Sequence, residues 1–235
     1  MIFYFKSLTV VVLLYFQASS VLAQPWQLEK DEQGIQIYLR AVPDSSIKEF
    51  KGEIRIKARI GSLLAVMNDT DACPQWVYNC AEPVLLEKIS FTERYNFQIS
   101  MMPLFITNRG LIFHTVLSQD AKSRAITMKM NASPDYCNTK QTETCQYIKK
   151  IKLIPITRSV GSYQFIPEPG GWTKVIWQQH IEPGGSLPGW LVNSLLLDLP
   201  YNTLDSLRTI VRNHKYIGMK LIYGSDGTAT GFKSR

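Results

Sequence analysis

The sequence lacks the signatures of most enzyme and membrane-protein classes. It contains no GxSxG nucleophile elbow, no HExxH pair and no phosphate-binding glycine loop, and its three histidines are spread over separate segments of the 235 residues. Apart from one run at the N-terminus, no stretch is apolar for long enough to cross a bilayer, which excludes a polytopic membrane protein. The formal charge of +7 is too small for a dedicated nucleic-acid binder, so we expect no nucleic acid as a partner.

The N-terminal segment has the pattern of a secretory signal. Lys6 supplies the positive start, an apolar stretch runs from Leu8 to Phe16, and small residues lead to Ala23. This stretch is shorter than the ~20 apolar residues that a spanning helix needs, although an uncleaved anchor stays the alternative. We therefore expect residues 1–23 to be removed from an exported protein, which is either periplasmic in a bacterium or secreted.

Cysteine is scarce, but its even count is informative. Four cysteines behind an export signal indicate disulfides formed in an oxidising compartment. Of the three possible pairings we favour Cys73 with Cys80 and Cys137 with Cys145, because each pair brackets a short polar segment; the other pairings stay open. Metal binding is the alternative, but it favours closer CxxC couplets with histidines nearby. We expect neither a metal nor a cofactor.

Strand patterns dominate the chain after residue 24. The clearest alternation of apolar and polar residues runs from Phe91 to Met101. Short helices are expected at 62–67 and 73–76. The connections between strands are too short for crossover helices, so the sheet should be antiparallel. Strands are predicted at 35–40, 53–60, 91–101, 111–118, 125–132, 147–154, 161–166 and 172–182.

The pattern changes to a helical period near the C-terminus. Leucines recur at helical spacing between Leu187 and His214, which predicts one long helix. Residues 217–235 carry little to bury and are expected to form a flexible tail. The fold class is thus α+β, with a curved antiparallel sheet and a long C-terminal helix that lies against it.

Several stretches are similar to the StAR-related lipid-transfer (START) domain, in its bacterial exported form. They are 64–69 (LAVMND) with 74–76 (PQW), 102–109 (MPLFITNR), 169–173 (PGGWT) and 183–190 (PGGSLPGW). The similarity extends from Trp26 to Tyr216, within a domain that we place at 24–216. It implies the helix-grip fold, in which the curved sheet wraps around the C-terminal helix. It also implies that a lipid or other hydrophobic molecule binds in an internal tunnel and is carried between membranes.

The resemblance also suggests which part of the chain covers the tunnel. Residues 101–106 (MMPLFI) match the loop that closes the tunnel mouth and touches the membrane in this family. The alternative is that they extend the preceding strand into the core, although Pro103 favours the loop. We expect transient contact with a membrane surface and a monomeric protein.

Side chains suited to binding the ligand lie on the expected strands, loop and helix. Each of them has ordinary core packing as its alternative. The candidate ligand-binding residues are Tyr95, Phe97, Met101, Phe105, Arg109, Phe113, Met128, Trp177, Trp190, Leu191 and Leu195.

Two positions depart from the family pattern. The family has an aspartate after the arginine that matches Arg109, but Gly110 stands there in this chain. Arg109 is therefore expected either to have a structural role or to face a lipid headgroup. The charged cavity pair of some sterol-binding members falls near Asn96 and Thr115, which weakens any inference to a sterol.

Two other functions stay open from the sequence. One is an enzyme of the wider helix-grip superfamily, of cyclase or hydrolase type, although no catalytic residue is assigned. The side chains to suspect in that case are Glu93, Arg94, His114 and His180. The other is a secreted module that presents its ligand to another protein without moving it between membranes.

Overall fold

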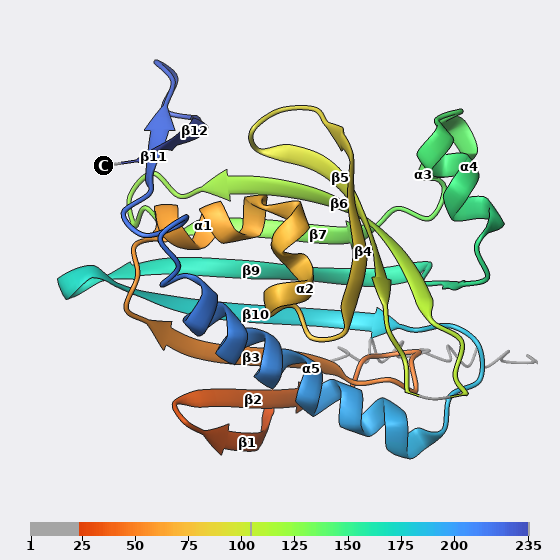
Figure 1. Cartoon of the computed structure of the whole chain (residues 1–235). Helices are drawn as coiled ribbons and strands as arrows, with labels where there is room; N and C mark the ends of the chain where they lie inside the picture. Colours follow the sequence, from red (N-terminus) through yellow and green to blue (C-terminus); the bar gives the residue numbers. More distant parts are fainter. Residues whose placement is uncertain (1–23, 104, 235) are drawn as a thin grey trace, which may run out of the picture.

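The computed structural model describes residues 24–103 and 105–234 (Figure 1). The expected signal at 1–23 and Leu104 of the expected loop lie outside the described residues. Within the described part, ten strands form one sheet in the order β1-β2-β3-β10-β9-β7-β6-β5-β4, with β8 beside β6. The strands are β1 (Gln27–Glu32), β2 (Ile35–Arg40), β3 (Glu49–Ile56), β4 (Cys80–Lys88), β5 (Glu93–Ser100), β6 (Arg109–Gln119), β7 (Ile126–Ala132), β8 (Ile154–Pro155), β9 (Arg158–Glu168) and β10 (Trp172–Glu182).

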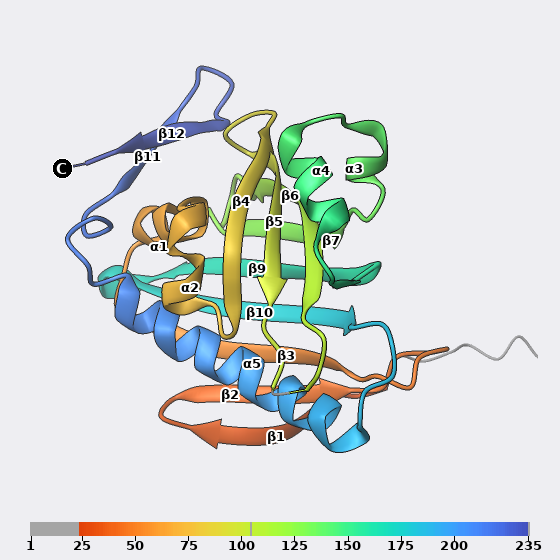
Figure 2. The ribbon, with the colours of Figure 1, turned by 45° about the vertical axis from the view of Figure 1, so that its right-hand side comes forward.

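The sheet curves around the long C-terminal helix. Figure 2 shows β4 and β5 running across the direction of β9 and β10, with α5 crossing in front of the sheet. Neighbouring strands pair antiparallel except for the short parallel contact of β8 with β6, as the sequence predicts. The helices are α1 (Ile60–Asn68), α2 (Cys73–Trp76), α3 (Tyr136–Thr139), α4 (Glu143–Lys150) and α5 (Gly189–Ile210), with 3-10 turns at Thr70–Ala72 and Pro169–Gly171.

Helix α5 packs directly on β2 and β3. Leu204 and Leu207 on the helix are fully buried, and so are Ile35 and Ile37 on β2. Gly52 on β3 allows this close approach, because a β-carbon there would lie 2.6 Å from Cδ1 of Leu204. The C-terminal helix therefore closes one end of the sheet firmly, through apolar side chains that the sequence periodicity predicts.

The segment after β7 differs from the sequence prediction. A strand is predicted at 147–154, but residues 143–150 form helix α4 and only Ile154 and Pro155 join the sheet. The Thr142 side chain accepts a hydrogen bond from the amide of Cys145, and Lys149 and Lys150 occupy the last turn. These N-cap and C-terminal charges stabilise a helix and outweigh the short apolar alternation.

Two disulfides join the favoured pairs of cysteines, Cys73 with Cys80 and Cys137 with Cys145. The first closes α2 onto the start of β4, and the second holds α3 against α4. Both are consistent with an oxidising, exported location.

The C-terminal segment is more ordered than the sequence predicts. Where a flexible tail is expected at 217–235, strands β11 (Lys220–Tyr223) and β12 (Ala229–Lys233) pair as an antiparallel hairpin. The ring of Phe232 packs edge-on against Phe91, with centroids 4.9 Å apart. Leu221 also packs partly against the main core. Leu221 and Phe232 hold the hairpin against the domain. Two apolar residues in a polar segment are too few for its composition to predict this packing.

Candidate ligand-binding cavity

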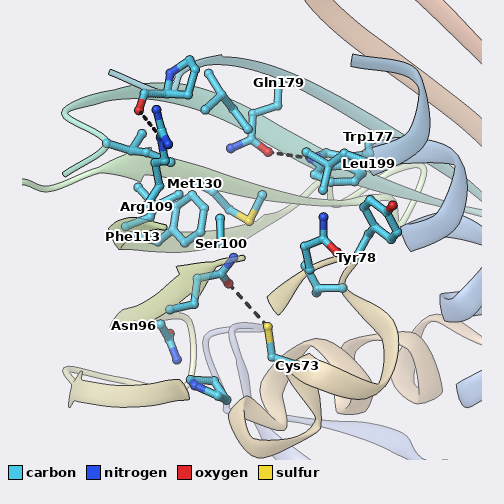
Figure 3. Close-up of a pocket in the computed structure, with 18 of the residues that line it drawn as sticks. Cys73, Tyr78, Asn96, Ser100, Arg109, Phe113, Met130, Trp177, Gln179 and Leu199 are labelled. Carbon is cyan, nitrogen blue, oxygen red and sulfur yellow. Dashed lines mark hydrogen bonds between the residues drawn. The ribbon is translucent and has the colours of Figure 1, made fainter. Parts of the chain in front are cut away.

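A cavity of about 190 Å³ lies between the concave side of the sheet and helix α5 (Figure 3). Strands β5, β6, β7, β9 and β10 supply one side of it, and α2, α5 and the β5–β6 loop supply the other. Among the candidate residues from the sequence, seven border this cavity and four do not. Those that border it are Phe97, Met101, Arg109, Phe113, Met128, Trp177 and Leu195.

The four remaining candidates lie elsewhere. Tyr95 packs on the outer face of the sheet, between His114 and Tyr136, with ring centroids 4.6 Å from each. Leu191 is buried beside the cavity without bordering it, and Phe105 and Trp190 are exposed. Tyr95 is predicted from the sequence to bind the ligand, but its side chain lies on the side of the sheet away from the cavity.

The β10 side of the cavity is aromatic and has its polar atoms satisfied. Trp177 stacks on Tyr163 at 4.9 Å and meets Phe50 edge-on at 4.8 Å. The indole Nε1 of Trp177 donates to Gln179 Oε1 at 2.9 Å, and Gln179 Nε2 donates to Ser159 Oγ at 2.8 Å. Because these polar groups bond one another, this surface presents rings to the cavity, which suits an apolar ligand.

Strand β5 turns its polar side toward the cavity, whereas the candidates Tyr95 and Phe97 from the sequence lie on its apolar side. Arg94, Asn96, Gln98 and Ser100 border the cavity. The apolar side of the strand packs in a second core cluster that α3 and α4 cover. The alternation itself is correct, but the insertion after β7 supplies a second apolar layer, so the hydrophobic side faces outward.

Arg94 holds the end of α1 against β5. Its Nη1 donates to Asn68 Oδ1, and its Nη2 donates to the carbonyl oxygen of Met67 at 2.6 Å. Burial lowers the pKa of the Arg94 guanidinium to about 10, so the group stays charged at neutral pH. Arg94 faces Thr115 across the β5–β6 ladder. From the sequence Arg94 is a candidate only for an enzyme, because its position on the inner face depends on the covering insertion.

Arg109 borders the cavity away from α1 and bonds three backbone carbonyl groups, an arrangement that we call the clamp. It is only 1% exposed. Its Nε donates to the carbonyl oxygen of Pro183 at 3.2 Å, its Nη2 to that of Gly184 at 3.1 Å, and its Nη1 to that of Thr107. Burial lowers the pKa of this guanidinium. The three carbonyl partners explain how the arginine is held without an aspartate at position 110.

The glycine at 110 has its own packing reason. A β-carbon on Gly110 would lie 3.0 Å from Leu153 Cδ1 and 3.3 Å from the ring of Phe97. An aspartate would therefore press against the second core cluster rather than reach Arg109. Gly110 therefore replaces the family's aspartate because the second core cluster, which α3 and α4 cover, leaves no room for a larger side chain.

Exposed apolar residues lie on two segments that border the cavity, the β5–β6 loop and the start of α5, which we call the mouth of the cavity. Phe105 is fully exposed at a positive φ of 71°, and Trp190 is 68% exposed at the start of α5. Met101 is also exposed, and it borders the cavity. The β5–β6 loop is turned by bonds from the Ile106 amide to Pro103 O and from the Met102 amide to Asn108 Oδ1. These residues are therefore not an extension of strand β5 into the core.

The other enzyme candidates lie outside the cavity. His114 Nε2 contacts Glu93 Oε1 at 2.8 Å on the outer face, and His180 Nε2 contacts Glu182 Oε1 at 3.3 Å. Neither histidine borders the cavity. Over the described ranges, no group of three or more histidine, cysteine or acidic side chains is placed to hold a metal ion. In that same part of the chain, no helix is long and apolar enough to cross a membrane.

A curved antiparallel sheet, a long C-terminal helix against it and a cavity between them define a domain of the hydrophobic ligand-binding class. No family model matches the chain. A solved bacterial structure, described as the STAR-related lipid transfer protein (fragment 25-204) from Xanthomonas axonopodis, is 32% identical to it with a TM-score of 0.69. That match covers 80% of this chain and 99% of the other. The protein belongs to the StAR-related lipid transfer (START) family.

The chain is also similar to other proteins. The uncharacterized protein PA1579 of Pseudomonas aeruginosa is 32% identical over 192 residues, which is 82% of this chain and 89% of that protein. Human STARD10 shares 16% identity, covers 80% of this chain and 74% of its own, and has a TM-score of 0.63. Human StAR-related lipid transfer protein 5 shares 13%, with coverages of 80% and 86% and a TM-score of 0.64. At these identities the human proteins support the fold alone.

Proposed function

We propose that the protein binds one lipid or other hydrophobic molecule in the cavity beneath α5 and carries it between membranes. The observation that carries this proposal is the apolar cavity whose mouth is bordered by Met101 and flanked by exposed Phe105 and Trp190. Family membership, through a bacterial relative described as a lipid transfer protein, supports it.

A carrier of this kind removes a large barrier. Each methylene kept from water contributes about 0.8 kcal/mol, so a chain of about twelve carbons resists entry into water by roughly 10 kcal/mol. Enclosing the chain against Phe113, Met128 and Leu195 replaces that exposure with apolar contact. The proposed activity is therefore binding and transport, which needs no chemical step.

The size of the cavity implies that loading involves movement. Its volume of about 190 Å³ lies below the range of about 300 to 1,000 Å³ of pockets that hold drug-sized ligands. We infer that the β5–β6 loop and the first turns of α5 move outward when a lipid enters. Arg109 ties the β5–β6 loop to β6 through Thr107, and it ties the loop that leads to α5 through Gly184.

The mouth is suited to contact with a membrane surface. Phe105 and Trp190 extend into solvent where the β5–β6 loop and α5 meet, and aromatic side chains insert favourably at the headgroup level. The net charge, +6 once residues 1–23 with Lys6 are lost, adds attraction to anionic lipids. Export to the periplasm or the cell exterior, after loss of residues 1–23, and a monomeric state are parts of the same proposal.

Binding without catalysis is favoured by the side chains around the cavity. Of the described residues that border it, none is a histidine, and its one carboxylate, Asp69, already accepts from Lys215 and Tyr216. Ser100 and Thr70 border the cavity without a neighbouring base. Among the described residues around the cavity there is therefore no histidine or unpaired carboxylate, the groups that most often supply general acid–base catalysis.

The test is the composition and activity of the full chain expressed in an exporting bacterium. Organic extraction followed by mass spectrometry should release a stoichiometric hydrophobic molecule. The protein should then move a fluorescent phospholipid from phosphatidylethanolamine–phosphatidylglycerol donor vesicles to acceptor vesicles. A protein that carries a ligand but transfers none would fit a presenting module, and one that carries none and changes an added substrate would be an enzyme.

A further inference from the structure

The cavity has one polar side and one apolar side. Figure 3 shows Asn96 and Ser100 of β5 across the space from Trp177 and Leu199. A ligand that fills this space therefore meets hydrogen-bonding groups on β5 and hydrocarbon on α5 and β10. That asymmetry fits an amphiphile better than a uniform hydrocarbon.

The charge on the polar side is unbalanced. Arg94 and Arg109 both border the cavity, and neither makes an ion pair within the described part of the chain. The carboxylate of Asp69 also borders the cavity, but it is held by Lys215 and Tyr216. Buried guanidinium groups without an acid are costly, because neutral carbonyls replace only part of their hydration.

The two arginines differ in how many of their N–H groups are available to bind a ligand. All three nitrogens of Arg109 donate to carbonyl oxygens, so this side chain is committed to the fold. Arg94 uses Nη1 and Nη2 for one bond each, to Asn68 and Met67. A guanidinium carries five N–H groups, so three on Arg94 and two on Arg109 make no hydrogen bond to the described residues. Desolvation, the cause of its lowered pKa, would be relieved by an anion.

We propose that the ligand is an anionic amphiphile whose carboxylate or phosphate oxygens bind the guanidinium of Arg94, with its chain lying along α5. This inference rests on the proposed binding function and adds the class of ligand. Arginine suits the task because its planar N–H groups match two oxygens of a carboxylate or phosphate at once. Asn96, whose Nδ2 donates to Thr70 Oγ1 at 2.8 Å, lies on the same polar side.

The test uses the full chain and four probes with the same ten-carbon chain. Displacement of the uncharged dye N-phenyl-1-naphthylamine at pH 7.5 is measured with decanoate, decyl phosphate, methyl decanoate and decanol. We expect at least one of the two anions to bind about tenfold or more tightly than both neutral probes, a difference of about 1.4 kcal/mol. Preference for decanoate indicates a free fatty acid, and preference for decyl phosphate indicates a phosphate headgroup.

Variants connect the preference to Arg94. Arg94→Gln should bring the anionic and neutral probes to equal affinity, Arg94→Lys should keep part of the preference, and Arg212→Gln, which removes an exposed arginine, should keep all of it. If Arg94→Gln does not fold, Arg94→Lys and the wild-type comparison decide. Equal binding of all four probes by the wild type overturns the inference and leaves the binding function standing. If none of the four displaces the dye, the binding function fails as well.

Discussion

The guanidinium of Arg109, at the first residue of β6, donates to the carbonyl oxygen of Gly184 in the loop that leads to α5, at 3.1 Å. A second bond reaches Pro183 and a third reaches Thr107 in the β5–β6 loop. One buried side chain therefore holds both the β5–β6 loop and the loop that leads to α5. A movement of these segments that opens the cavity must therefore keep the three hydrogen bonds of Arg109 or break some of them.

Replacing the clamp should destabilise the protein strongly. Arg109→Met removes the donors of three carbonyl oxygens, and we expect the free energy of unfolding to fall by about 3 kcal/mol or more. Arg109→Lys should recover only part of this, because an ammonium cannot span three acceptors in a plane. Urea denaturation followed by tryptophan fluorescence measures both. A loss below about 0.5 kcal/mol for Arg109→Met, within the range of ordinary surface substitutions, would contradict the clamp.

Stability should also depend on acid pH through Asp69. Burial raises the pKa of this carboxyl, but hydrogen bonds from Lys215 and Tyr216 and the charge of Lys215 outweigh burial, so the pKa lies below its ordinary value of 3.8. A depressed folded pKa contributes stability above the unfolded pKa and loses it as pH falls through the folded pKa. We expect Asp69→Asn to be less stable than wild type at pH 7, with the difference shrinking below about pH 4. A difference that stays constant from pH 7 to pH 3 would exclude this contribution.

The exposed aromatic tip should govern membrane contact without affecting the ligand. Phe105→Asp should weaken binding to phosphatidylglycerol-containing vesicles by about tenfold or more, because a fully inserted phenylalanine contributes about 1.5 to 3 kcal/mol. The content of bound lipid should stay the same, since Phe105 does not border the cavity. Ile89→Asp is the matched control, as Ile89 is exposed in the turn at the opposite end of β5. Vesicle cosedimentation that responds equally to both substitutions would remove the special role of this loop.

Much of the fold could be predicted from the sequence, and the errors have a common cause. The two-residue period identifies β2 and β10, and the leucine spacing identifies α5, because each of these elements buries one side in the main core. The same period identifies β5, which buries its apolar side in the second core cluster. Periodicity does not say which side of a strand is buried when both sides are covered. On β5 the insertion of α3 and α4 covers the outer side, so Tyr95 faces away from the cavity and Arg94 faces into it.

The same limit applies to the site. Met128, Trp177 and Leu195 could be predicted because their strands or helix have one apolar side toward the core. Phe113 stands on β6, which buries apolar side chains on both sides, so its prediction rests on the residue type alone. The partners of Arg109 could not, since Pro183 and Gly184 lie more than seventy positions away and contribute only backbone carbonyls. The shape of the cavity depends on how the β5–β6 loop and α5 meet, which local pattern does not encode.

The occupancy of the cavity in two tryptophan variants tests the account most directly. Leu195 borders the cavity from α5, whereas Asn193, two residues before it on the same helix, is exposed. Native mass spectrometry of the full chain from an exporting bacterium should find a hydrophobic adduct on the wild type and on Asn193→Trp, and little or none on Leu195→Trp, with all three folded. An adduct that is absent from the wild type, or that persists at full occupancy when the indole of Leu195→Trp fills the space, would contradict a ligand in this cavity.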